Sequence, residues 1–163
     1  MKKIIIFILT LSAISFARSR VGEWAAYDYT EKTAQSDLQG QLVKEVIGEQ
    51  KKVINGEKVT LLNINERFVA SGRQIKERSY WDVDTSFFNK FELKLFVFLC
   101  RFQSRMGKYR HITVKAGSFD TCKVKDQENW VGAVPFGTVL SIIDDGTTFR
   151  RYELINYSWK KKN

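Results

Sequence analysis

The stretch VINGEKVTLLNIN, Val53 to Asn65, decides the fold class of this chain. Asn55-Gly56 separates two runs of β-favouring residues, and both residues accept the positive φ angles that a two-residue hairpin turn requires. After the turn, Thr60, Leu62 and Ile64 alternate with neighbours such as asparagine, which is typical of a strand with one side in water. The sequence therefore predicts an antiparallel hairpin around this turn.

The segment before the turn is open to two interpretations. Leucine, valine and isoleucine residues within 38–47 recur at helical spacing, but Gly40 and Gly48 weaken a helix. Because the strand after the turn is well defined, we predict that 41–54 is its hairpin partner. Further strands are expected over 22–30 and 73–83.

The C-terminal half shows short β-favouring runs separated by turn residues. The turns are expected at Ala116-Gly117, Pro135-Phe136-Gly137 and Asp144-Asp145-Gly146, because glycine and proline supply the backbone angles that turns need. We interpret these turn residues as a scaffold that sets strand register, in preference to a binding site. The expected strands are 111–115, 118–125, 129–134, 138–143 and 147–159.

A different pattern lies between these two β regions. Large apolar side chains are spaced by one, three or four positions, as on one side of an amphipathic helix. A residue within 84–86 is expected to cap this helix and Gly107 to end it. A strand over 91–99 is the alternative, because phenylalanine favours sheets. The apolar residues are Phe87, Phe88, Phe91, Leu95, Phe98, Leu99 and Phe102.

Together these elements predict a mainly β (α+β) protein. We expect a curved antiparallel sheet, or half-barrel, of about eight strands packed on one apolar helix. The length of the chain, 163 residues, favours a single domain. That β-rich domain is expected to occupy 18–163.

The first seventeen residues, MKKIIIFILTLSAISFA, are organised as a secretory signal peptide. Two lysines precede a short apolar run, and small residues stand at the positions that a signal peptidase reads, which predicts cleavage after Ala17. The apolar run is shorter than the roughly 20 residues of a membrane-spanning helix. We therefore predict a periplasmic or secreted protein with 1–17 removed.

The two cysteines, Cys100 and Cys122, have two possible states. A pair of cysteines in an exported chain predicts one disulfide between them. The alternative is two buried thiols, since Cys100 lies in a very apolar run and free cysteine packs like a small apolar residue. Both interpretations stay open at this stage.

The formal net charge of +9 favours acidic partners. Export argues against nucleic acid, which leaves a lipid, an acidic envelope component, or peripheral contact with an anionic membrane surface. A basic surface that only keeps the protein soluble is the alternative.

Four short motifs carry a resemblance to a known family. They are GEWAAYDYT (22–30), ITVKAGSFDTCKV (112–124), WVGAVPFGTVLSI (130–142) and RYELINY (151–157). In order and spacing they resemble exported bacterial domains similar to the periplasmic lipoprotein carriers of the LolA and LppX kind. This resemblance implies an antiparallel half-barrel closed by helix, with an apolar interior that holds an acyl chain. The chain differs in having one convincing helix where such carriers have several lid helices.

The sequence contains no recognised catalytic or metal-binding motif. His111 is the only histidine, and no second ligand stands at metal spacing from it. Motifs such as the nucleophile elbow, the P-loop and the dinucleotide fingerprint are also missing. We therefore expect a non-enzymatic protein without cofactor or metal. A small secreted hydrolase that uses His111 as a proton shuttle is the remaining enzymatic alternative.

The predicted function follows from the helix and the compartment. We expect an exported non-enzymatic binding protein that binds lipid or an acyl chain in a half-barrel. The alternative is a cell-envelope assembly or interaction protein with a filled core and a basic docking surface. The apolar helix positions either fill the core or line the acyl-chain site. These candidate ligand-binding residues are Phe87, Phe88, Phe91, Leu95, Phe98 and Phe102.

Overall fold

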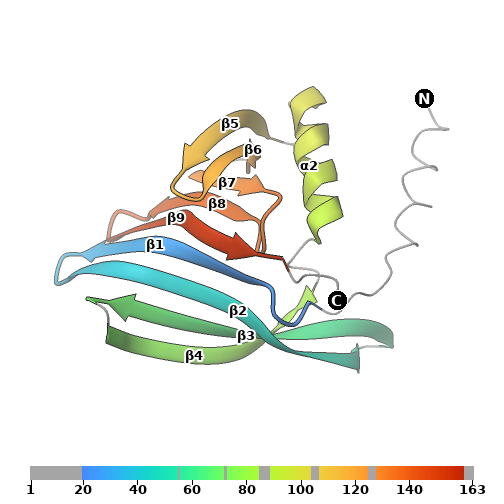
Figure 1. Ribbon diagram of the computed structural model, residues 1–163, viewed down its shortest axis with the longest axis horizontal. Coiled ribbons are helices and arrows are strands. Elements are labelled where there is room, and N and C mark those ends of the chain that lie inside the picture. Colours follow the sequence, from blue (N-terminus) through green and yellow to red (C-terminus); the bar gives the residue numbers. More distant parts are fainter. Residues whose placement is uncertain are drawn as a thin grey trace.

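The structure is a computed structural model that describes residues 20–54, 56–71, 73–84, 89–103, 107–124 and 128–159. These residues form a curved, open antiparallel sheet of nine strands with a helix packed against it (Figure 1). The predicted mainly β class is therefore confirmed, and the nine strands agree with the expected number of about eight. The predicted signal peptide lies outside the described residues.

The strand order in the sheet is β4-β3-β2-β1-β9-β8-β7-β6-β5. Consecutive strands pair with each other, except β4 and β5, which form the two edges of the sheet. β9 pairs with β1, so the first and last strands meet inside the sheet. The strands are β1 (Trp24–Thr33), β2 (Asp37–Ile54), β3 (Glu57–Ala70), β4 (Arg73–Val83), β5 (Lys108–Val114), β6 (Gly117–Lys123), β7 (Glu128–Gly132), β8 (Thr138–Asp144) and β9 (Thr148–Ser158). The helix is α2 (Lys90–Phe102).

The strand interpretation of the segment before the Asn55-Gly56 turn is confirmed, because β2 runs through it. Gly40, which weakened the helix interpretation, has a packing role in this strand. A Cβ atom at Gly40 would lie 2.3 Å from the carbonyl oxygen of Val69 and 2.8 Å from the ring of Phe68. Glycine at this position therefore lets β2 and β3 approach closely.

The β2–β3 hairpin reaches beyond its neighbours in the sheet. The paired residues of β1 and β2 end at Trp24 and Glu45, and those of β3 and β4 end at Leu61 and Val83. Residues 51–54 and 57–60, which we call the arm, consequently pair only with each other. Figure 1 shows the arm projecting from the sheet as a two-stranded ribbon.

The core contains two clusters of buried side chains that share one contact. Phe136, in the loop between β7 and β8, packs against both clusters. Phe136 adopts a left-handed conformation with φ of 63°, and the fully buried Pro135 precedes it. This loop supports the scaffold interpretation of the Pro135-Phe136-Gly137 turn. The larger cluster is Ala25, Tyr27, Val114, Val134, Val139 and Leu154, and the smaller is Val46, Leu62 and Ile64.

The helix is confirmed, and the strand alternative over 91–99 is wrong. Asn89 caps its start, since its side chain accepts hydrogen bonds from the backbone N–H groups of Phe91 and Glu92. The Glu92 side chain accepts from the Asn89 N–H in return, which completes a capping box. The expected cap within 84–86 was therefore wrong, because the Asn–x–x–Glu pair satisfies the free N–H groups three residues later.

The expected helix end at Gly107 was also wrong. The helix ends at Phe102, and the N–H of Gln103 donates the last bond to the carbonyl of Leu99. Gly107 instead precedes β5, with φ of 154°. A Cβ there would lie 2.3 Å from the carbonyl oxygen of Lys123. Close approach to β6, rather than helix termination, accounts for this glycine.

A disulfide joins Cys100 of α2 to Cys122 of β6, with 6.0 Å between the Cα atoms. The disulfide prediction is confirmed, and the alternative of two free thiols is wrong. Both residues are buried where the helix meets β5, β6 and β7. The bond therefore fastens the helix to one end of the sheet.

Candidate functional site

The outward side of α2 carries a row of large apolar side chains, which we call the stripe. Its members are Phe91 (65% exposed), Leu95 (39%), Phe98 (58%) and Phe102 (68%). These four were predicted to fill the core or to line an interior site, but they face away from the sheet. The other two candidate residues, Phe87 and Phe88, lie outside the described residues.

Helical geometry explains this orientation. The helix turns by about 100° per residue, so the four positions of the stripe fall on one side. Leu93, Val97 and Cys100 fall on the opposite side and are buried against the sheet. Both sides of α2 are therefore apolar, and apolar spacing alone does not reveal which side packs inward. The smaller side chains face the sheet, where they allow close approach.

Basic side chains flank the stripe. Lys90, Lys94 and Arg101 share one flank of the helix at four- and seven-residue spacings, and all three are exposed. Glu92 lies on the other flank, where its carboxylate accepts the capping hydrogen bond of Asn89. The Arg101 guanidinium lies over the ring of Tyr109, 5.5 Å from its centre. The stripe thus has a cationic border on one side.

Three features hold the stripe in place. The disulfide ties the last turns of α2 to β6, and the capping box fixes its first turn. Leu93 packs so close to Gly137 that a Cβ on the glycine would lie 3.4 Å from the leucine. Within the stripe, the rings of Phe98 and Phe102 lie 4.9 Å apart. The apolar surface is therefore a pre-arranged feature of the fold.

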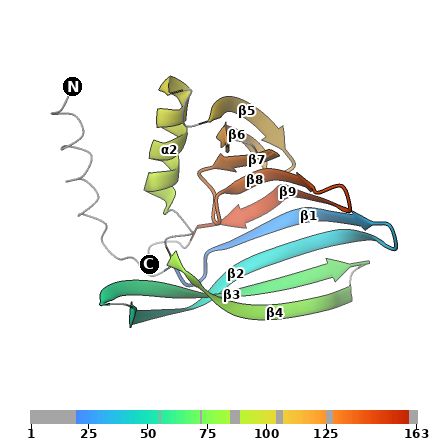
Figure 2. The ribbon, with the colours of Figure 1, turned by 180° about the vertical axis from the view of Figure 1, so that it is seen from behind.

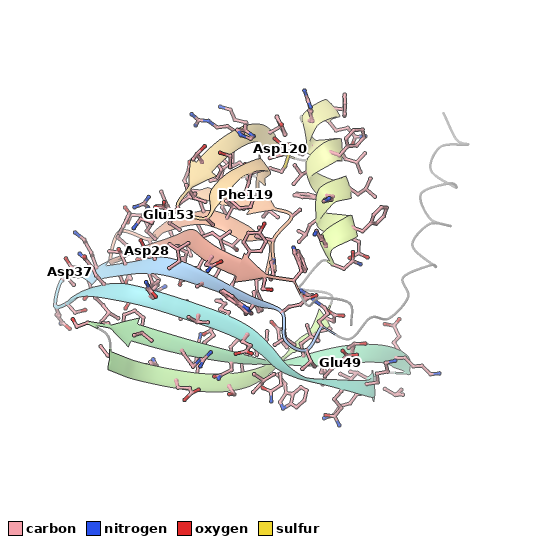
Figure 3. The ribbon with its side chains drawn as sticks, in the orientation of Figure 1. Asp28, Asp37, Glu49, Phe119, Asp120 and Glu153 are labelled. Carbon is pink, nitrogen blue, oxygen red and sulfur yellow. A yellow bond between two sulfur atoms is a disulfide. The ribbon has the colours of Figure 1, made fainter. Side chains whose placement is uncertain are left out.

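The residue considered as a proton shuttle, His111, is hydrogen-bonded to Asp120 at the surface. Its Nδ1 is 2.9 Å from Oδ1 of Asp120, and both side chains are 60% exposed. The Tyr109 hydroxyl donates to the same oxygen at 2.7 Å. Hydrogen bonds from His111 and then Tyr109 lower the pKa of Asp120. Asp120 lies on β6 toward α2 (Figure 3), and the geometry is that of a cross-strand pair on a water-exposed face.

Glu66 on β3 is a buried charge that sequence reasoning missed. Its carboxylate forms ion pairs with Lys44 at 2.8 Å and with Arg78 at 2.5 Å. It also accepts hydrogen bonds from Arg78 at 2.6 Å and from the Tyr80 hydroxyl at 3.0 Å. Burial raises the pKa of Glu66, but attraction to Lys44 and the hydrogen bonds outweigh it, so the pKa lies below its usual range. Strand alternation gave a usable signal, since Glu66 stands between the buried Ile64 and Phe68.

A cluster of tyrosines lies on the same side of the sheet as Glu66. The hydroxyl of Tyr27 is buried with no hydrogen-bond partner among the described residues, and burial raises the pKa of Tyr27. The Tyr29 ring contacts the rings of Phe68 and Tyr152. Since the Glu66 carboxylate is fully occupied by its partners, we assign this region a structural role.

A polar groove of about 590 Å³ opens on the sheet. Its charged groups are paired with each other, Lys115 with Asp28 and Arg151 with Glu153. Asp28 and Glu153 lie on neighbouring strands, away from α2 (Figure 3). The groove is therefore distinct from the apolar interior that was predicted. It is lined by Asp28, Tyr29, Thr30, Gln39, Gly40, Gln41, Val69, Ser71, Lys115, Arg151 and Glu153.

Two further findings concern the part of the chain that the structure describes. There, no cluster of three histidine, cysteine or carboxylate side chains is placed to hold a metal ion. Within the same residues, no helix has the length and apolar character to cross a bilayer.

No family model, curated protein or solved structure matches the chain.

Proposed function

We propose that this chain is an exported, non-enzymatic binding protein that places the stripe of α2 on an anionic lipid surface. The observation that carries the proposal is the stripe itself. Four large apolar side chains are held in water on a helix whose opposite side is already packed on the sheet. Exposed apolar patches that are contiguous and bordered by polar residues commonly mark interaction surfaces.

The size of the stripe supports a specific contact. Its exposed apolar area is on the order of 400 Å², taking about 200 Å² for each aromatic side chain. At about 25 cal/mol per Å², full transfer out of water stabilises the bound state by at most roughly 10 kcal/mol. A helix that lies in the headgroup region gains part of this, because its side chains enter only partly.

The chemistry around the stripe favours lipid over a second copy of this chain. A helix with an apolar side and lysine or arginine at its border is suited to the plane of an anionic membrane surface. Lys90, Lys94 and Arg101 supply that border, and each cation near such a surface contributes about 1 kcal/mol. A stable protein dimer needs about 800 Å² from each partner, roughly twice what the stripe offers.

The predicted export and the resemblance to lipoprotein carriers point to the same class of ligand, and both remain predictions. The outward orientation of the stripe moves the proposed contact from the interior of a half-barrel to the outside of the helix. The alternative function, docking to an acidic envelope protein, draws on the same cations and on the filled core around Phe136. It predicts binding that depends on charge but needs no lipid.

Vesicle co-sedimentation tests the proposal. We expect the oxidised protein, prepared without 1–17, to bind vesicles of phosphatidylglycerol and phosphatidylcholine. Binding to phosphatidylcholine alone should be much weaker, and salt should weaken binding to the mixed vesicles. Phe98→Ser combined with Phe91→Ser should reduce binding to mixed vesicles at least tenfold, while Ile143→Ser, which removes an exposed isoleucine from β8, should leave it within twofold. Equal binding by the double variant and the parent would refute the proposal.

A further inference from the structure

The exposed large apolar residues of the described chain are concentrated in two places. Of ten such residues, four form the stripe and four lie on the arm or at its base. Only Ile75 and Ile143 lie elsewhere. The four associated with the arm are Ile47 (44%), Val53 (66%), Ile54 (43%) and Trp81 (50%). The arm is therefore a second apolar surface, built from strands instead of a helix.

The tip of the arm combines apolar and cationic side chains. Val53 and Ile54 are consecutive in β2, so they project to opposite sides of the ribbon. Lys58 pairs with Val53 across the ribbon, and Lys51 and Lys52 precede it. Glu57, paired with Ile54, is the single carboxylate in the arm. A ribbon with three cations, one carboxylate and apolar residues at its end suits an anionic interface.

The base of the arm carries the tryptophan. Trp81 of β4 pairs with Asn63, which in turn pairs with Gly48. Its ring lies over Gly48, since a Cβ there would be 3.8 Å from the ring. A half-exposed tryptophan is suited to the boundary between water and hydrocarbon, because its body is apolar and its N–H is a donor. Ile47, the adjacent bulge residue, extends the same patch.

The arm and the stripe lie at the same end of the molecule. Figures 1 and 2, which view the protein from opposite sides, both show α2 and the free end of the β2–β3 hairpin toward one end of the sheet. The labelled Glu49, next to the arm, lies at that end as well (Figure 3). α2 packs against β5, β6 and β7, so its opposite side, the stripe, faces away from the sheet.

Ion pairs fix the base of the arm. Oε2 of Glu49 accepts a hydrogen bond from the backbone N–H of Arg20 at 3.2 Å. The Arg20 side chain in turn pairs with Glu23 at 2.9 Å and with Asp84, just after β4, at 3.0 Å. Arg20 and Glu23 are almost completely buried. These polar contacts therefore hold the base of the arm in place.

We propose that the arm is a second lipid-contact element, which inserts Val53 and Ile54 between the headgroups of an anionic bilayer while α2 lies on the same surface. Lys51, Lys52 and Lys58 contact lipid phosphates, and Trp81 sits at the boundary above the arm tip. This inference rests on the proposed function of the stripe. It assigns an anionic lipid partner to the arm, whose residues pair only with each other in the described sheet.

The test compares three variants on mixed phosphatidylglycerol and phosphatidylcholine vesicles. The arm variant is Val53→Asp with Ile54→Asp, the stripe variant is Phe91→Asp with Phe98→Asp, and the control is Ile143→Asp on β8. All substituted side chains are at least 43% exposed, so circular dichroism and thermal melting should match the parent. We expect the arm and stripe variants each to lose at least tenfold in vesicle affinity and the control to stay within twofold.

The variants separate the two proposals. Loss in the stripe variant with unchanged binding in the arm variant would overturn the arm proposal and leave the proposed function standing. Loss in the arm variant alone would support the arm contact and overturn the role of the stripe. If neither variant loses affinity, both proposals fail.

A second measurement uses the native protein and one conservative substitution. Brominated phosphatidylglycerol quenches tryptophan that enters the bilayer boundary, and Trp81 provides the native probe. We expect vesicles of this lipid to quench part of the emission of the native protein and Trp81→Phe to remove that part. Quenching that is the same with and without Trp81 would overturn the insertion of the arm.

Discussion

Cys100 on α2 and Cys122 on β6 are joined by a disulfide at the end of the helix that carries Phe98 and Phe102. The bond closes a loop with a sequence separation of 22 residues. Besides Cys100, only Leu93 and Val97 of α2 are buried. The covalent link is therefore a large share of what keeps the stripe in its outward orientation.

Removal of this bond should lower stability and loosen the helix. Closure of a loop of this size contributes about 3 kcal/mol on the chain-entropy account. Cys100→Ser combined with Cys122→Ser should therefore reduce the free energy of unfolding by roughly that amount. Urea denaturation of the parent with and without reductant measures the same quantity. Unfolding midpoints that do not respond to reductant or to the double substitution would contradict this account.

Glu66 should make the protein sensitive to acid. Its pKa in the folded state lies below the unfolded value, so its ion pairs stabilise fully at neutral pH. That stabilisation is lost as the pH falls below about 4.5 and through the folded pKa. Glu66→Gln should cost about 2 kcal/mol at pH 7, less than a fully buried pair, because the Arg78 side chain is 63% exposed.

The measurement for Glu66 is urea unfolding at several pH values. The difference in unfolding free energy between the parent and Glu66→Gln should shrink as the pH is lowered from 7 toward 3. The exposed ion pair of Lys32 and Asp37 offers a control, since Asp37→Asn should change stability by less than about 0.5 kcal/mol. A difference for Glu66→Gln that is constant with pH would show that its charge is not the cause.

The strands around Asn55-Gly56 were predictable because their signals are local. A turn dipeptide and an alternation of apolar and polar residues define a hairpin without reference to the rest of the chain. The β4 bounds, 73–83, also match the prediction. Pairing of β1 with β9 was beyond such reasoning, because it joins segments more than a hundred residues apart.

The candidate site was only partly predictable for a different reason. The sequence identified the apolar helix and its phenylalanines, but α2 is apolar on two opposite sides. Which side packs on the sheet depends on the shape of the sheet and on where Cys122 lies. The importance of the arm depends on where the neighbouring strands end, which follows from their register and not from the arm sequence.

Gly40 should resist substitution even by alanine. The added Cβ would meet the Val69 carbonyl and the Phe68 ring, and a backbone atom gives way only if β2 and β3 move apart. Overpacking of this kind costs about 1–3 kcal/mol. Gln41→Ala, at the adjacent exposed position, should cost less than about 0.5 kcal/mol. Similar melting temperatures for the two variants would contradict the close approach at Gly40.

Phe136 should connect the two core clusters energetically as well as by contact. Phe136→Asn removes the ring while keeping a residue that tolerates the positive φ, so the loss reports packing and not backbone strain. The half-buried ring should be worth about 3 kcal/mol, the lower end of the range for large aromatic truncations. Hydrogen exchange should then accelerate both at Val46 in one cluster and at Val139 in the other. Acceleration confined to Val139 would mean that the ring serves only the cluster around β8, and that the long hairpin holds its own core without it.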